Sequence, residues 1–108
     1  EFLNHGGIDN NYSLLNHDQN NLCASVFSLK TKMGAEYYTN QPGIQFYTGN
    51  YLNGTEVGKG DWKYEFRNAF CLETQHFPDS INQPHFPSTV LRPKEKYTQT
   101  TVHKFGVK

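Results

Sequence analysis

The fold of this chain is constrained most by short runs of strand-forming residues that are repeatedly broken by Gly, Asn and Pro. Val, Ile, Thr, Tyr and Phe dominate these runs, as they do in β-strands. No stretch of ten or more residues carries the apolar spacing of an amphipathic helix. The sequence therefore predicts an all-β fold without internal repeats.

We expect about six short extended segments, of which the first two form a hairpin that turns at Lys32–Gly34. The chain up to Asn11 is expected to be a loop or a strand end, and 49–60 and the proline-containing 76–87 are expected to be irregular. Such strands suit one end of a β-sandwich and would leave sheet edges bare. The expected segments are Leu22–Thr31, Ala35–Thr39, Ile44–Thr48, Phe70–Gln75, Ser88–Leu91 and Tyr97–Phe105.

Size and charge limit the classes of protein to consider. With 108 residues the chain is large enough for one small domain, and its aromatic content of 15% supplies buriable surface. A formal net charge of zero gives no basic surface for nucleic acid or anionic lipid, and no apolar run approaches the ~20 residues that span a bilayer. Cys23 and Cys71 fit neither a disulfide framework nor a metal motif, so reduced thiols and a cytoplasmic location are expected. Because the chain begins with Glu, we expect a fragment or a processed product.

Strand alternation brings several polar side chains to one face of the sheet. Glu73 shares a face with Cys71 and Gln75, opposite an apolar face, because successive strand residues point to opposite sides. Gln45 likewise lies on the polar face of its strand. A face of this kind suits a sugar, whose hydroxyl groups need paired donors and acceptors.

Each candidate residue also has an ordinary structural interpretation. Glu73 is either a general base whose pKa is raised by partial burial, or an exposed strand residue, alone or paired with Lys or Arg. Asp9 follows two glycines and is typical of a turn, Gln45 is typical of strands, and His76 is placed by Gln75 near the same pocket rim. No histidine has the spacing of a metal ligand, and no phosphate-binding loop is present, so neither a metal nor another cofactor is expected.

Four segments resemble the C-terminal part of the aldose 1-epimerase (galactose mutarotase) family. These are PGIQFYTGNYLNGT, FCLETQHFPDSINQPHFPSTVLRP, YTQTTVHKF and the upstream GGIDNNYSL, which is similar to the family's Gly-x-Asp-[His/Asn]-Asn-[Phe/Tyr] stretch. They occur in the family's order from Gly6 to Phe105. The resemblance implies that residues 1–108 are the C-terminal segment of a single aldose 1-epimerase domain, a large antiparallel β-sandwich of the supersandwich type.

The same resemblance implies an activity, the interconversion of the α and β anomers of galactose, glucose and related aldoses. In the family a glutamate removes the proton of the C1 hydroxyl while a histidine protonates the ring oxygen. The matching base is Glu73, and the matching substrate-binding residues are Asp9 and Gln45. An aldose sugar is the implied partner, no cofactor is implied, and the whole protein is expected to be a monomer.

The acid of this reaction has no match in the chain. In the family the catalytic histidine lies upstream of the matched segments. The five histidines of this sequence are His5, His17, His76, His85 and His103, and none corresponds to it. We therefore expect the 108-residue chain to be inactive or nearly so by itself. The alternatives are a non-catalytic carbohydrate-binding or truncated mutarotase-like protein, and a piece that does not fold alone.

Overall fold

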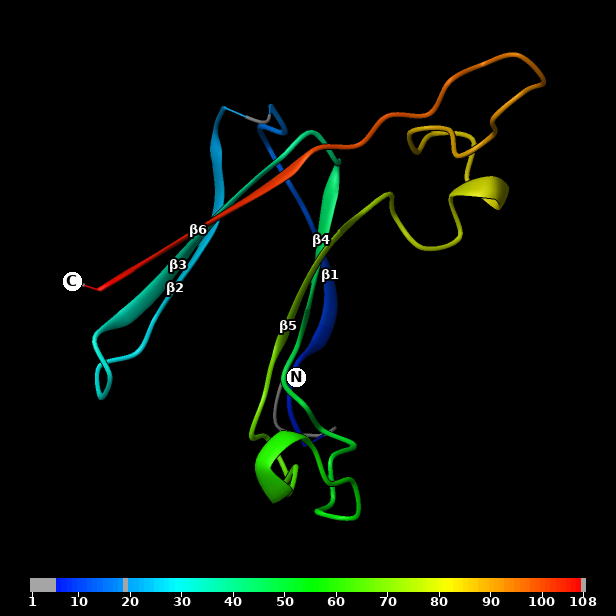
Figure 1. The fold of residues 1–108 in the computed structure, drawn as a ribbon. Helices are drawn as coiled ribbons and strands as arrows, with labels where there is room; N and C mark the ends of the chain where they lie inside the picture. Colours follow the sequence, from blue (N-terminus) through cyan, green and yellow to red (C-terminus); the bar gives the residue numbers. More distant parts are fainter. Residues whose placement is uncertain (1–5, 19, 108) are drawn as a thin grey trace. The chain divides into compact units, whose positions relative to one another are not determined.

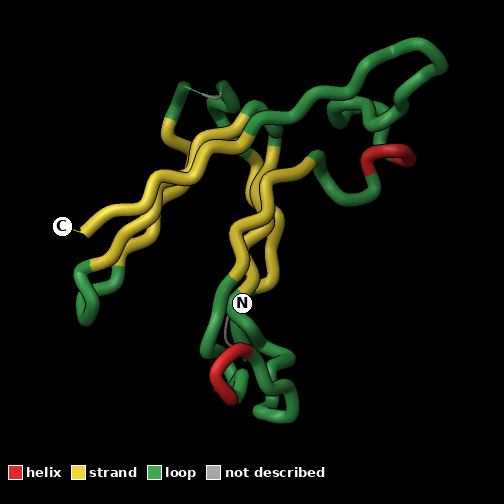
Figure 2. The backbone as a smooth tube through the Cα atoms, viewed as in Figure 1, coloured by secondary structure: helices red, strands yellow, loops and turns green. Residues whose placement is uncertain are grey.

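The structure is a computed structural model that describes residues 6–18 and 20–107. It confirms the predicted all-β class, since the described chain forms strands and two single-turn 3-10 helices (Figure 1). The strands make two three-stranded sheets, ordered β1-β4-β5 and β2-β3-β6, which are joined by a short connection at residues 40–42 and by longer loops (Figure 2). The elements are β1 (Asp9–Ser13), β2 (Leu22–Phe27), β3 (Met33–Thr39), β4 (Gly43–Tyr47), η1 (Lys59–Asp61), β5 (Cys71–Gln75), η2 (Ser80–Asn82) and β6 (Thr101–Val107).

Contacts between residues divide the chain into two compact units. The first unit joins the N-terminal stretch through Tyr12 to Gln45–Glu73, and the second joins Ser13–Ile44 to the chain from Thr74 onward. All three site residues predicted from the sequence belong to the first unit. Sheet β2-β3-β6 belongs to the second.

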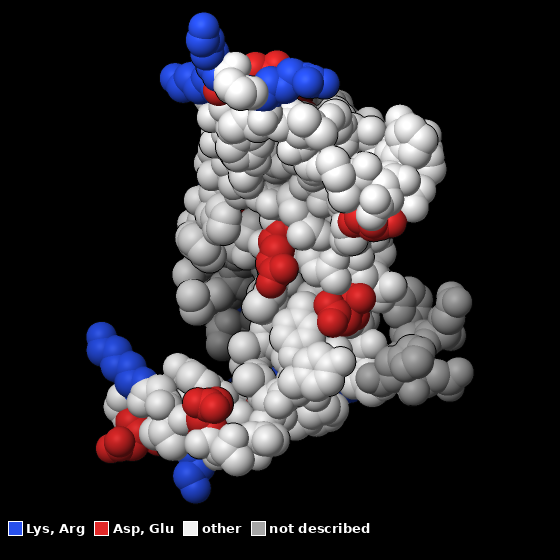
Figure 3. Space-filling view, turned by 90° about the vertical axis from the view of Figure 1, so that its right-hand side faces the viewer, with Lys and Arg blue, Asp and Glu red and all other residues white. Residues whose placement is uncertain are grey.

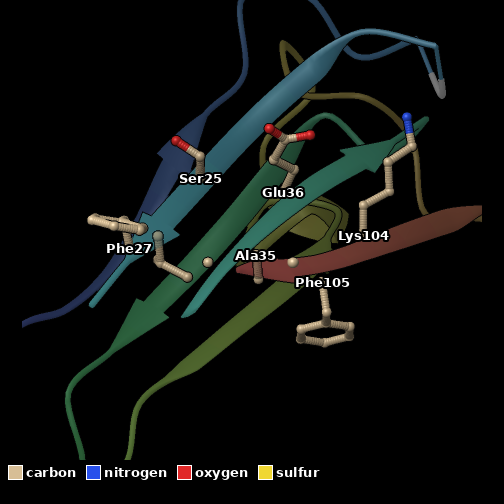
Figure 4. A pocket seen from close by; sticks show the side chains of 9 residues that line it. Ser25, Phe27, Ala35, Glu36, Lys104 and Phe105 are labelled. Atoms are coloured by element: carbon tan, nitrogen blue, oxygen red, sulfur yellow. The ribbon is translucent and has the colours of Figure 1, made fainter. Parts of the chain in front are cut away.

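Sheet β2-β3-β6 is antiparallel, with β3 in the centre. Its register pairs Ser25 of β2 with Glu36 of β3, and Glu36 with Lys104 of β6. These three side chains project from the same side of the sheet, whereas Ala35 and Phe105 project from the other side (Figure 4). The alternation expected of strands therefore holds at these positions, whereas the register between β2 and β3 shifts between Leu22 and Ala24.

The predicted hairpin between β2 and β3 is present, but its turn lies further upstream than expected. The N–H of Ser28 donates to the carbonyl of Met33 at 2.9 Å, and the N–H of Lys32 donates back to the carbonyl of Ser28 at 2.8 Å. Lys32 takes the left-handed conformation with φ of 59°. Because the chain reverses before Met33, both Met33 and Gly34 belong to β3, and the prediction of a turn at Lys32–Gly34 is wrong.

The buried part of the second unit follows alternate residues of β3. Ala35 and Tyr37 are 6% and 7% exposed, and Thr39 is completely buried. The Tyr37 ring packs at 4.8 Å, centroid to centroid, from the ring of His103 on the paired strand β6. This face of β3 is thus the most buried part of the sheet, and His103 of β6 packs against it.

Sheet β1-β4-β5 contains the two strands predicted around Gln45 and Glu73, each within one residue of the expected bounds. Phe46 and Phe70 meet edge to face with 6.2 Å between ring centroids. Strand β1 was not predicted, since Gly and Asn around Asp9 suggested a turn. It joins the sheet as the outer neighbour of β4.

The last strand begins later than the sequence suggests. β6 starts at Thr101, which pairs with Thr39, the final residue of β3. Before that point β3 offers no partner, and the N–H of Thr100 instead donates to the Asn40 side chain at 3.1 Å. Residues 97–100 and the expected extended segment 88–91 therefore lie in the long loop between β5 and β6.

The segments predicted to be irregular are confirmed as loops. The connection between β4 and β5 contains one isolated antiparallel bridge between Val57 and Lys63 and the single turn η1. The proline-containing segment after β5 contains only the single turn η2. Both cysteines are free thiols.

Candidate functional site

Three strands bring the predicted site residues to one sheet. Asp9 is the first residue of β1, Gln45 lies in the central strand β4, and Glu73 lies in β5. They are 36 and 28 residues apart along the chain (45 − 9 and 73 − 45). Only strand pairing unites them.

Asp9 and Gln45 are directly bonded. The Gln45 amide donates from Nε2 to Oδ1 of Asp9 at 2.8 Å. This contact corrects the interpretation of Asp9 as a turn residue, since Asp9 belongs to a strand and its carboxylate is bonded to the neighbouring strand. The bond also orients the Gln45 amide, so the pair presents a fixed arrangement of polar atoms.

Gly7, two residues before Asp9, lets the chain pass close to the start of the β4–β5 connection. Gly7 has φ of 152°, and a Cβ there would overlap the side chains of Asn50 and Thr48. Ile8 is held on both sides, because its N–H donates to Thr48 Oγ1 at 2.9 Å and its carbonyl accepts from Asn50 Nδ2 at 2.9 Å. A larger residue at Gly7 would push Ile8 and Asp9 away from this anchor.

Glu73 shares its face of β5 with Cys71, as strand alternation predicted. Burial raises the pKa of the Cys71 thiol, and the negative charge and hydrogen bond of Glu73 and the charge of Asp9 raise it further. The carboxylates of Glu73 and Asp9 therefore both raise the pKa of the same thiol, that of Cys71.

Glu73 is exposed, whereas the functional interpretation of the sequence assumed partial burial. That assumption is wrong for this chain. Cys71 and Leu72 of β5 are half-buried, whereas the side chain of Glu73 is exposed. The carboxylate is consequently open to an approaching solute. The period-two alternation predicted Cys71 as a neighbour of Glu73, but not that both Glu73 and Asp9 raise the pKa of its thiol.

Such a set of groups can hold hydroxyls and exchange protons with them. Carboxylates accept hydrogen bonds, and the amide of a glutamine both donates and accepts. A positioned carboxylate can also act as a general base toward a hydroxyl. Within residues 6–18 and 20–107, no group of three or more His, Cys, Asp or Glu side chains is arranged to hold a metal ion.

His76, expected near the pocket rim, is half-buried directly after β5. It lines a cavity of about 620 Å³ together with Asn40 and Gln41. This cavity lies within the second unit, so His76 is assigned to that cavity here.

The open face of sheet β2-β3-β6 has a smaller hollow of about 160 Å³ above Gly34 and Gly106 (Figure 4). Two of its charged lining side chains, Glu36 and Lys104, contact the neighbouring Tyr38. The Tyr38 hydroxyl donates to Glu36 Oε2 at 3.0 Å, and the Lys104 ammonium lies 4.3 Å from the centre of the Tyr38 ring. This hollow is therefore a poorer candidate site than the sheet that carries Glu73.

Charged side chains occupy a small part of one face of the molecule. In Figure 3 the basic side chains lie at the top and the bottom of the view, acidic side chains lie in the middle and beside them, and most of that surface is uncharged. This distribution agrees with the formal net charge of zero. Among the described residues, no helix has the length and apolarity needed to cross a membrane.

Comparisons with known proteins point to one family. Residues 1–104 match the aldose 1-epimerase family. The chain is 48% identical over 101 residues to the galactose mutarotase of Homo sapiens, and 37% identical over 90 residues to the aldose 1-epimerase of Escherichia coli K12. These alignments cover 94% and 82% of this chain, but 30% and 26% of the relatives.

A solved structure gives the same result for the fold. The crystal structure of a GalM/aldose epimerase homologue from C. elegans matches this chain with a TM-score of 0.81 at 26% identity, covering 93% of this chain and 30% of that chain. The chain thus spans 30% or less of the length of the relatives named here. Because the family match extends over nearly all of its residues, the chain belongs to the aldose 1-epimerase family.

Proposed function

We propose that this chain supplies the base and two sugar contacts of an aldose 1-epimerase that interconverts the α and β anomers of galactose and glucose. The proposal rests chiefly on the gathering of Asp9, Gln45 and Glu73 onto one sheet from three strands. The 2.8 Å bond between Gln45 and Asp9 supports it further. These are also the positions that match the family's base and substrate contacts.

In the proposed reaction Glu73 accepts the proton of the C1 hydroxyl while a general acid protonates the ring oxygen. The bond between C1 and the ring oxygen then breaks, which gives the open-chain aldehyde. Rotation about the C1–C2 bond turns the other face of the carbonyl toward the ring hydroxyl. Reclosure returns both protons to their donors, so the sugar changes only its configuration at C1.

Asp9 and Gln45 are assigned to holding the sugar. The Asp9 carboxylate accepts a hydrogen bond from a sugar hydroxyl, and its bond to Gln45 fixes the direction of that acceptor. Fixed acceptors keep the C1 hydroxyl within reach of Glu73, and positioning of this kind lowers the entropic part of a reaction barrier. The exposure of Glu73 leaves its carboxylate accessible to the sugar.

The acid is proposed to come from outside these 108 residues, as the family resemblance implies. On this proposal the chain is the C-terminal segment of one aldose 1-epimerase domain, and the complete protein is a monomer. Free Cys23 and Cys71 are consistent with the proposed cytoplasmic location. A base without its acid loses about 10²–10⁴-fold in rate, so the isolated chain is expected to be inactive or nearly so.

A chimaera tests the assignment of Glu73. The upstream part of the Homo sapiens galactose mutarotase would be joined to this chain, and mutarotation of freshly dissolved α-galactose would be followed by polarimetry. We expect an active chimaera in which Glu73→Gln lowers the rate by about 10²–10⁴-fold. Glu56→Gln removes an exposed carboxylate from the β4–β5 connection and serves as the matched control, with an unchanged rate. An active chimaera that tolerates Glu73→Gln would contradict the assignment.

A non-catalytic carbohydrate-binding role is the second candidate. The bonded Asp9–Gln45 pair favours it, since the pair can hold a sugar whether or not an acid is present. Galactose binding to an inactive chimaera, lost with Asp9→Ala, would support this role over catalysis. Calorimetry that detects no galactose binding at tens of millimolar sugar would count against both candidates.

A further inference from the structure

The backbone bonds between β1 and β4 fix the register of these two strands. The N–H of Thr48 donates to the carbonyl of Ile8 at 3.0 Å, and the N–H of Leu14 donates to the carbonyl of Pro42 at 2.9 Å. Both pairs of residue numbers add to 56, so the strands are antiparallel and their register is the same at both ends. The pairing of every residue between these two bonds follows from this register.

Tyr47 of β4 is the residue directly opposite Asp9 of β1, since these two numbers also add to 56. Pairs that alternate with the hydrogen-bonded ones have the closest side chains, with Cβ atoms about 4.5–5.5 Å apart on one face of the sheet. Gln45 lies on this face as well, and its 2.8 Å bond to Asp9 is the diagonal contact that the register allows. Tyr47 is thus a direct neighbour of the two residues proposed to hold the sugar.

The ring of Tyr47 is held from the start of the β4–β5 connection. Its hydroxyl oxygen accepts a hydrogen bond from the N–H of Tyr51 at 2.9 Å. The two rings are stacked, with 6.1 Å between their centroids and 20° between their planes. Tyr47 is half-buried, whereas Tyr51 is 83% exposed. Tyr51 therefore supports the Tyr47 ring and is itself open to solvent.

A sugar needs an apolar surface in addition to hydrogen-bonding groups, because its hydroxyls lie around the rim of the ring and C–H groups cover its faces. Ligand sites in general combine apolar surface with a few well-placed polar groups. Among the described residues that β1, β4 and β5 place on this face by alternation, Tyr47 is the one aromatic side chain. An aromatic ring supplies a large and flat apolar surface, which matches the face of a pyranose.

We propose that Tyr47 is a further sugar-binding residue of this site, whose ring packs against the C–H face of an aldose while Asp9 and Gln45 bond its hydroxyls. Tyr51 is assigned to positioning, since it acts through Tyr47 by holding that ring. The inference rests on the proposed function, which makes Asp9 and Gln45 the sugar contacts. It adds a basis for selectivity, because a cyclic sugar presents a flat C–H face and an open-chain polyol does not.

Binding of D-galactose and of galactitol to the chimaera of the Homo sapiens upstream part and this chain, measured by calorimetry, tests the inference. Galactitol offers similar hydroxyls without a ring. We expect Tyr47→Ala to weaken galactose binding by about three- to tenfold and galactitol binding by less than about twofold. Tyr47→Phe keeps the ring and should retain galactose binding within about twofold. Unchanged galactose binding in Tyr47→Ala, or an equal loss for both ligands, would overturn the inference.

Kinetics of the same chimaera separate this inference from the proposed function. Contacts that are equal in the ground state and the transition state change KM alone when they are lost, so Tyr47→Ala should raise KM about three- to tenfold and leave kcat within about twofold. Activity that is lost with Glu73→Gln but keeps its KM in Tyr47→Ala would overturn this inference and leave the proposed function standing. An inactive chimaera that binds galactose more weakly with Tyr47→Ala would support this inference and count against catalysis.

Tyr51→Ala provides a second variant at an exposed position, in case Tyr47→Ala does not fold. It keeps the N–H that bonds to Tyr47 and removes the stacked ring, so we expect galactose binding about two- to threefold weaker, with kcat unchanged. Trp62→Ala removes another exposed ring of the same connection and is the matched control, with unchanged binding. Equal galactose binding by Tyr51→Ala and Trp62→Ala would contradict the assignment of Tyr51 and Tyr47.

Discussion

Polar side chains on the sheet that carries Glu73 and in the cavity lined by Gln41 differ in burial and in hydrogen bonding. On the sheet, the Asp9 carboxylate is exposed and bonded to Gln45, and Glu73 is exposed beside Cys71. In the cavity, the Gln41 amide is almost completely buried, and its oxygen has no partner.

This difference indicates different capacities. A carboxylate that solutes can reach is able to take and return a proton, which acid–base chemistry requires. A buried neutral amide has no proton to exchange and can only accept or donate a hydrogen bond. We therefore propose acid–base chemistry for the sheet, and the predictions below compare it with the buried segment around Gln41.

The largest effect is expected from Thr39→Val, which damages the cavity and spares the sheet. Thr39 is fully buried, and its hydroxyl joins Gln41 to Thr100. Removing the hydroxyl leaves the buried N–H of Gln41 without its acceptor, so urea denaturation should show a loss of about 1–3 kcal/mol in the free energy of unfolding. Thr98→Val, at an exposed position of the same cavity, is the control and should change stability by no more than about 0.5 kcal/mol. Equal effects of the two variants would remove the special role of the Thr39 hydroxyl.

A smaller effect is expected at the sheet from the Asp9–Gln45 pair. The pair is bonded at 2.8 Å but lies at an exposed position. A double-mutant cycle with Asp9→Ala and Gln45→Ala, measured by urea denaturation, should therefore give a coupling energy of only about 0.5–1 kcal/mol. Strictly additive single variants would show that the bond does not join β1 to β4 in solution.

The smallest effect is expected on the pKa of the Cys71 thiol, which the charges of Glu73 and Asp9 raise. The negative charge of Glu73 contributes to the raised pKa of Cys71, so neutral Gln at that position should lower the pKa toward its ordinary value. The reactive thiolate of Cys71 would then form at a lower pH than in the parent chain. The pH profile of iodoacetamide alkylation at Cys71 should consequently move to lower pH in Glu73→Gln.

Cys23 provides the internal control for this measurement. Its pKa is raised chiefly by burial, and its thiol donates to the carbonyl of Tyr37 at 3.0 Å. Glu73 does not contribute to that shift, so alkylation of Cys23 should keep its pH profile. A parallel movement of both profiles would indicate a general loosening of the fold.

Much of the fold follows from the sequence because alternation and breakers act locally. The strands around Gln45 and Glu73 were predicted within one residue, since Gly, Pro and Asn bound their apolar-polar alternation. The hairpin turn and the start of β6 were misplaced, because each depends on where a partner strand ends. Thr101 starts β6 only because Thr39 ends β3.

The candidate site was likewise predicted in part: local features followed from the sequence, and contacts between strands did not. Alternation alone placed Glu73 beside Cys71, whereas the bond of Asp9 to Gln45 needed the unpredicted strand β1. The exposure of Glu73 was also missed, because burial depends on how the sheet is covered and not on its own alternation. The cavity at Gln41 joins segments more than 50 residues apart (98 − 41), and no local pattern foretells it.

Polarimetry of the isolated 108-residue chain tests the central claim most directly, namely that this chain contains the base of the reaction without its acid. The rate of mutarotation of freshly dissolved α-galactose would be compared in buffer, with the chain and with its Glu73→Gln variant. We predict the same rate in all three, because a lone base lacks the proton donor for the ring oxygen. Mutarotation faster than buffer that disappears with Glu73→Gln would contradict the claim and place a working acid within these residues.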